Sequence, residues 1–114
     1  QFCWHLNNNI GLDFRVNNEI EIKWLKKRRW YYFSVYEYEE PTRFLSHYVY
    51  NTQFDGEYLL PEFKHLDFLW LMKGDEVSDE SLQETIQTIR SINSVQLVTE
   101  LSVSQIKNKE NLIF

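Results

Sequence analysis

The spacing of hydrophobic residues predicts a helix near the start of the chain. Phe2 and Leu6 are separated by about one helical turn, which predicts a helix over residues 1–9. Gly11 supplies the stop, because glycine adopts the left-handed conformation at which many helices end. We expect Cys3 to be a small buried hydrophobe of this helix.

The hydrophobic period then changes to two. Between residues 20 and 24, hydrophobic and charged positions alternate, which predicts a strand with one solvent-exposed face. Two further strands are expected over 30–38 and 44–50, with a turn over 39–42. Their connections are too short for a crossover, so the three strands should form an antiparallel meander.

The second half of the sequence predicts a strand, a helix and a last strand. The most apolar segment, 66–72, indicates a central strand covered on both faces, and it follows a helical turn that opens at Pro61. Ser78 is expected to cap a helix, and a final strand is expected over 95–101. The region 66–101 would then be a right-handed β-α-β unit. The buried stripe of the helix would consist of Leu82, Ile86 and Ile89.

Together these elements predict an α+β fold, a mainly antiparallel sheet with two helices packed on one face. The arrangement is ferredoxin-like with an inserted hairpin if another strand precedes the first helix. The chain starts with Gln, and Phe2 already belongs to an apolar pattern, so we expect its natural start to be missing. The length of 114 residues and the mass of 14.0 kDa are typical of one domain, here 1–114.

Composition argues against several function classes. No apolar run approaches the roughly 20 residues that span a bilayer, so we expect a cytoplasmic protein without membrane contact. One cysteine excludes a multi-cysteine zinc site, and no two histidines stand four apart, so no metal is expected. There is no glycine-rich phosphate loop and no serine nucleophile motif. The sequence therefore predicts a protein that is not an enzyme and uses no cofactor.

Charge is distributed unevenly along the chain. The net charge is −5, yet five of the twelve basic residues fall within seven positions that contain no acid. This stretch carries +5, which leaves −10 on the remainder. Such an arrangement directs one part of a molecule toward polyanions. The basic cluster consists of Lys23, Lys26, Lys27, Arg28 and Arg29.

The basic cluster lies at an expected turn and beside aromatic residues. Cations contact phosphates and aromatic rings stack on bases, so the combination favours RNA. On this hypothesis the cluster and Arg43 contact phosphates, while Trp30 and Tyr31 stack or wedge. The alternative is a solvated hairpin tip. A different function class, a ferredoxin-like small-ligand-binding or regulatory domain, rests on analogy of fold alone.

Two carboxylates leave a third class open. Asp67 interrupts an otherwise apolar strand, and Glu62 lies close to it in sequence. The pair could act as acid and base. With no nucleophile, metal or phosphate loop nearby, a structural role is favoured, in which Glu62 caps backbone amides and Asp67 pins the preceding turn or meets an arginine.

The same segment carries a family resemblance. The segment 60–68 resembles the signature of the IPExxxVDY family of Bacteroidota-type bacteria. It matches that signature outright at Pro61, Glu62 and Asp67. The remaining motif positions depart mildly, with Leu60 for Ile, Leu66 for Val and Phe68 for Tyr.

The resemblance extends over most of the chain. It includes residues 4–7 leading to 11–12, the segment 33–38 and the ending 109–114. It implies an extra strand before the first helix and no established enzymatic activity. It further implies a lineage-specific protein of the large ribosomal subunit, whose partners are ribosomal RNA and neighbouring ribosomal proteins.

Overall fold

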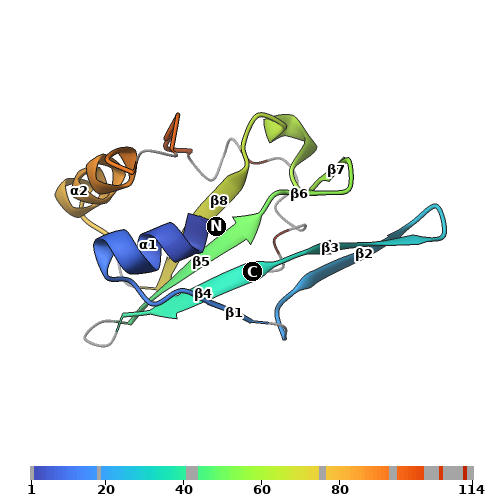
Figure 1. The fold of residues 1–114 in the computed structure, drawn as a ribbon, viewed down its shortest axis with the longest axis horizontal. Helices are drawn as coiled ribbons and strands as arrows, with labels where there is room; N and C mark the ends of the chain where they lie inside the picture. The colour runs from blue at the N-terminus through green and yellow to red at the C-terminus, as the bar shows by residue number, and fades with distance from the viewer. Residues whose placement is uncertain are drawn as a thin grey trace.

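The computed structural model shows a mixed α and β arrangement, drawn in Figure 1. It describes residues 2–17, 19–40, 44–74, 77–92, 95–101, 106 and 112. The elements in chain order are α1 (Phe2–Ile10), β1 (Arg15–Val16), β2 (Ile22–Lys26), β3 (Arg29–Phe33), β4 (Val35–Glu39), β5 (Leu45–Asn51), β6 (Gln53–Phe54), β7 (Glu57–Tyr58), the 3-10 turn η1 (Pro61–Phe63), β8 (Phe68–Gly74) and α2 (Asp79–Arg90).

A four-stranded antiparallel sheet, in the order β1-β4-β5-β8, forms the body of the molecule. Both helices pack on one of its faces, where α1 contributes Cys3 and Leu6 and α2 contributes Ile89 to a shared core cluster. The sheet meets them with Val49 of β5 and Trp70 of β8. The predicted α+β class, with two helices on one face of a mainly antiparallel sheet, is confirmed.

The opposite face of the sheet carries a second core cluster. Val35 and Tyr50 contribute to it from the sheet, and Phe33 contributes from β3. Leu59 and Leu60 cover this face from the segment after β7. The other buried members are Ile22, Tyr31 and Leu112. Because successive strand residues point to opposite faces, a single strand contributes to both clusters, as β5 does with Val49 and Tyr50.

The predicted strand over 30–38 is divided between two sheets, so the three-strand meander is wrong as one sheet. Up to Phe33 it pairs with β2 in a separate two-stranded ribbon, and from Val35 it pairs with β5 and β1. Ser34 lies at the change of partner, and its carbonyl accepts a hydrogen bond from Asn51 N at 2.9 Å. Side-chain alternation continues through Ser34, because Phe33 and Val35 are buried in the same cluster.

The expected last strand over 95–101 is wrong. These residues form no strand, and β8 pairs only with β5 among the described residues, which makes β8 an edge strand rather than a central one. The less exposed positions are Val95, Val98 and Leu101, a spacing of three that does not fit a sheet. In the described part of 66–101 the predicted β-α-β unit therefore lacks its second strand, and the ferredoxin-like arrangement is not confirmed.

The two helices form where the sequence predicts them. Gly11 follows α1 with φ of +81°. Ser78 caps α2, and its Oγ accepts a hydrogen bond from Ser81 N at 3.1 Å. In the ranges that the structure describes, no helix has the length and apolar character needed to cross a membrane.

Cys3 lies on the buried face of α1, and burial raises the pKa of its thiol from 9.0 to about 11. We expect native Cys3 to react with a disulfide reagent far more slowly than the denatured chain, because the thiolate is the nucleophile. Timed reaction with and without denaturant measures this, and equal rates would contradict it.

The raised pKa of Cys3 also makes stability depend on pH. Since the pKa of the thiol is higher in the folded protein than in the unfolded chain, its contribution to the free energy of unfolding is complete below pH 9 and falls as the pH rises toward 11.

Candidate nucleic-acid interface

The basic cluster forms the end of a two-stranded ribbon, β2–β3. The strands pair from Ile22 opposite Phe33 to Lys26 opposite Arg29, which leaves a two-residue turn of Lys27 and Arg28. Both turn residues have positive φ, +52° and +64°. That combination is the signature of a type I′ turn, whose twist matches the flanking strands.

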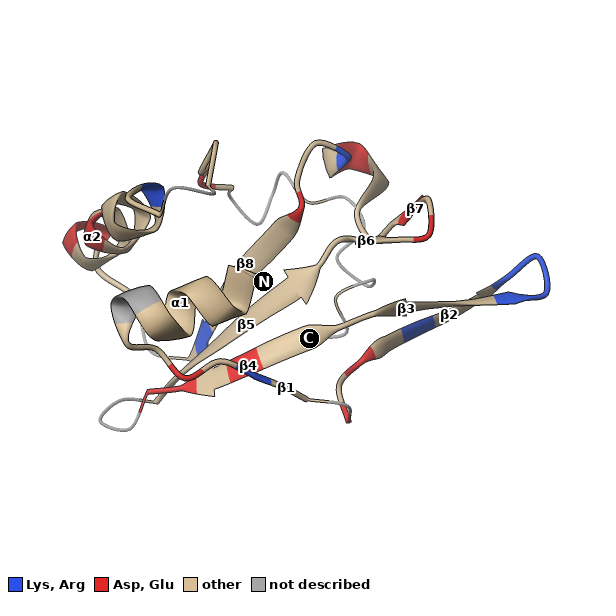
Figure 2. Cartoon of the chain, viewed as in Figure 1, with Lys and Arg blue, Asp and Glu red and all other residues tan. Residues whose placement is uncertain are grey.

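The ribbon projects from the body, and its end is basic. Figure 2 shows Lys and Arg gathered at the turn, whereas Asp and Glu are spread over the other elements. The ribbon lies along the long axis of the molecule, whose extents are 44 × 30 × 29 Å. A partner that reaches the basic turn therefore meets Lys27 and Arg28 first, and the nearest acids are Asp55 and Glu57, which pair with the flanking Arg29 and Lys26.

Two of the basic residues are held by the small β6–β7 hairpin. Lys26 Nζ lies 3.0 and 3.2 Å from the two carboxylate oxygens of Glu57. Arg29 forms an ion pair with Asp55, and its guanidinium lies 5.6 Å from the centre of the Tyr31 ring. These cations thus fix the ribbon to its neighbour and are partly neutralised.

The other cations of the cluster remain open to a ligand. Lys23, Lys27 and Arg28 are exposed, and none of them has an ion pair with another described residue. The predicted phosphate contact Arg43 lies outside the described residues.

The two faces of the ribbon differ, and this corrects one predicted site residue. Tyr31, predicted to stack on bases, is only 8% exposed, because it faces the core and meets Phe54 at a ring distance of 6.2 Å. Trp30, on the opposite face, is 51% exposed, which the predicted stacking on bases requires. Tyr32 and Leu25 share that outer face and were missed, although simple alternation from Trp30 would have selected Tyr32.

One buried threonine holds the segment 60–68, which carries the family resemblance. Thr52 Oγ1 donates to the carbonyl of Leu66 at 2.6 Å, and Thr52 N donates to the carbonyl of Asp67 at 3.3 Å. The Thr52 carbonyl accepts from Leu59 N at 2.8 Å. Thr52 therefore ties both ends of the segment to the sheet, and no sequence motif singles it out.

The motif side chains lie in different environments. Leu60 is buried in the core and Pro61 opens η1, as predicted. Asp67 is exposed and precedes β8, so the expectation that it interrupts an apolar strand is wrong. Phe68 begins that strand and stacks on Phe2 at 4.8 Å. The two half-buried members are Glu62 and Leu66.

A polar network lies beneath α2. Trp70 Nε1 donates to His47 Nδ1 at 3.0 Å, and His47 Nε2 lies 2.8 Å from Glu40 Oε1. Because an indole N–H can only donate, Nδ1 must accept, and the ring hydrogen then sits on Nε2 toward Glu40. The cavity beside this network, lined also by Thr85 and Thr88, has about 250 Å³. That volume is below the roughly 300 Å³ at which small-molecule pockets begin.

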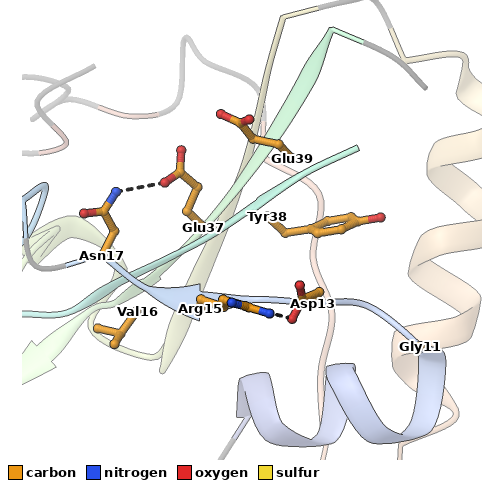
Figure 3. Close-up of a pocket in the computed structure, with 8 residues that line it drawn as sticks. All are labelled: Gly11, Asp13, Arg15, Val16, Asn17, Glu37, Tyr38 and Glu39. Atoms are coloured by element: carbon orange, nitrogen blue, oxygen red, sulfur yellow. Dashed lines mark hydrogen bonds and ion pairs between the residues drawn. The ribbon is translucent and has the colours of Figure 1, made fainter. Parts of the chain in front are cut away.

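A larger groove of about 810 Å³ lies where the α1–β1 connection meets β4 (Figure 3). The groove is lined by three acidic residues, Asp13, Glu37 and Glu39, and by one basic residue, Arg15. Arg15 forms an ion pair with Asp13 at 3.2 Å. Asn17 Nδ2 donates to Glu37 Oε2 at 2.8 Å. Its excess of carboxylates makes this groove unsuitable for phosphate groups.

Comparison with known proteins gives no match, so the function of the ribbon is argued from its own residues. No family model matches the chain. No curated protein is similar to it. No solved structure matches its fold. Within the described ranges, His, Cys, Asp and Glu form no group of three that could hold a metal ion.

Proposed function

We propose that the protein is a non-enzymatic RNA-binding protein of the cytoplasm that associates with the large ribosomal subunit through the β2–β3 ribbon. The observation that carries this proposal is the position of Lys27 and Arg28, exposed at the end of a projecting ribbon and without an ion pair to another described residue. Lys23 adds a third exposed cation on the same ribbon.

The acidic body supports contact through the ribbon alone. A net charge of −5 repels a polyanion, so RNA is attracted where the charge is locally reversed. With three available cations, the slope of log affinity against log salt should be about −2 for a single strand, at roughly 0.7 for each phosphate contact.

Sedimentation of a cell lysate through a sucrose gradient tests the ribosomal association. The protein should migrate with large subunits at low salt and remain there at moderate salt. If it stays at the top of the gradient at low salt, the association is excluded. Binding to purified ribosomal RNA, measured separately, then tests whether the ribbon binds RNA outside a ribosome.

The acids of the β6–β7 hairpin should limit RNA affinity. Changing Asp55→Asn together with Glu57→Gln releases Arg29 and Lys26, so we expect binding about tenfold tighter at low salt. The salt slope should steepen by about 1.4, the share of two phosphate contacts. Titration over a series of salt concentrations measures both quantities.

A matched control separates local release from the change of net charge. Asp79→Asn with Glu80→Gln removes two exposed acids at the start of α2, far from the ribbon (Figure 2). We expect this control to alter affinity only slightly. Equal gains from the two double variants would mean that the ion pairs do not restrict Lys26 and Arg29.

A further inference from the structure

The outer face of the ribbon exposes large apolar side chains. Leu25 is 62% exposed, Trp30 is 51% exposed and Tyr32 is 39% exposed. Lys23 completes this outer face, since Lys23 pairs with Tyr32 and Leu25 pairs with Trp30 across the two strands. Covering apolar surface of this size is favourable, and Leu25 and Trp30 are the most exposed of the three side chains.

The spacing of the outer-face rings suits nucleic-acid bases. Trp30 and Tyr32 are two residues apart on one strand, so their attachment points are separated by about 6.8 Å. That separation is twice the roughly 3.4 Å rise between successive bases. The two rings therefore match bases that lie two steps apart in a stacked strand, with room for one base between them.

Cations flank the same face at both ends. Lys27 and Arg28 lie at the turn, next to the Leu25–Trp30 pair, and Lys23 lies opposite Tyr32. Phosphates of a strand whose bases stack on the rings would thus meet positive charge on either side. An alternation of rings and cations is the usual composition of single-strand binding surfaces.

We propose that the outer face of the ribbon binds unpaired RNA, with bases stacked on Trp30 and Tyr32 and phosphates held by Lys23, Lys27 and Arg28. This inference rests on the proposed RNA-binding function and names its substrate class. Bases inside an A-form duplex stack on one another, and its major groove is too narrow for side chains to read. The ligand is therefore a loop, bulge or single-stranded end.

The test compares two forms of one RNA. A labelled 12-nucleotide single strand, and the same strand annealed to its complement, are titrated with the full chain and followed by fluorescence anisotropy. The wild type should bind the single strand at least tenfold more tightly than the duplex. Trp30→Ala and Tyr32→Ala should each weaken single-strand binding by about tenfold, within the range for one stacked base.

Matched variants keep the result interpretable. Trp4→Ala removes a tryptophan that is 59% exposed on α1, away from the ribbon, and should leave binding unchanged. Tyr32 meets Phe54 at a ring distance of 5.8 Å, so thermal unfolding of each variant checks the fold. Trp30→Ala is the decisive variant, because Trp30 has no ring contact with another described residue.

The possible outcomes separate this inference from the proposed function. Salt-dependent binding with no preference for the single strand, unaffected by Trp30→Ala, would overturn the stacking inference and retain RNA binding. No binding to either form would overturn both. Binding to vesicles with anionic lipids that competes with the RNA and is lost in Trp30→Ala would assign the outer face to a membrane surface and overturn the inference.

Discussion

Replacing the ribbon turn by Lys27→Asn and Arg28→Gly is expected to stabilise the protein while removing most of its RNA binding. Both residues hold positive φ, which costs a side-chain-bearing residue roughly 1–2 kcal/mol. Asn-Gly is the preferred sequence for such a turn, so we expect the free energy of unfolding to rise by about 1–2 kcal/mol. Another two-residue turn in the molecule, between β6 and β7, already has a sequence of this kind, Asp55-Gly56.

The same change removes two of the three available cations. Each charge-assisted hydrogen bond to a phosphate is worth about 1.5–3 kcal/mol, so RNA affinity should fall about a hundredfold or more. The salt slope should fall in magnitude by about 1.4. Urea unfolding and RNA titration measure the two opposite effects on one variant.

A second variant separates charge from backbone strain. Lys27→Ala with Arg28→Ala removes the charges and keeps side chains at positive φ, so it should lose binding without becoming more stable. Changing all four residues 26–29 is less informative, because Lys26 and Arg29 also hold the β6–β7 hairpin. If the Asn-Gly variant binds RNA as tightly as the wild type, the turn is not the contact.

The largest loss of stability is expected from His47→Leu. His47 is 6% exposed and joins Trp70 to Glu40 through both ring nitrogens. Leucine matches its burial but leaves the indole N–H and the carboxylate without this partner. Leaving a partly buried donor and acceptor without this partner costs about 1–3 kcal/mol, and the loss of packing around the His47 ring adds to this.

Urea unfolding of His47→Leu measures this loss, and Trp70→Phe should cost less because it removes one neutral donor. His65→Leu serves as the control, since His65 is exposed after η1. We expect the control to change the free energy of unfolding by less than about 0.5 kcal/mol. A similarly small effect of His47→Leu would mean that the network contributes little to stability.

Local patterns in the sequence predict the parts of the fold that local physics decides. Both helices begin near their predicted positions and α1 ends near Gly11, because apolar spacing, the Ser78 cap and Gly11 act within a few residues. The change of partner at Ser34 could not be predicted in this way, since nothing near Ser34 differs from an ordinary strand. The choice of β5 or β2 as partner depends on residues far away in the sequence.

The error at 95–101 has a different origin. Apolar content suggested a strand there, but Val95 and Val98 pack against the helix-covered face, and Arg90 Nη2 donates to the Val98 carbonyl at 3.2 Å. In the sequence, Leu97 stands two residues after Val95, which fits a strand, but Leu97 is 68% exposed and only the burial in the structure has a period of three. The sequence alone therefore does not separate the two interpretations.

The sequence predicts the basic turn, but it does not show which of the cations are already paired with acids. Lys26 and Glu57 are 31 residues apart, so no local pattern shows that this lysine is already paired. In contrast, the alternation of side chains along β3 is enough to show that Tyr32, and not Tyr31, shares the exposed face with Trp30.

The unbroken alternation across Ser34 constrains how the ribbon can change in length. Deleting one residue from β3 would turn Trp30 inward and Tyr31 outward, because every side chain beyond the deletion changes face. Adding two residues to each strand would keep both faces and move the basic turn outward by about 6.8 Å. We therefore expect homologous ribbons to differ in length by an even number of residues in each strand, because an odd number would exchange the two faces.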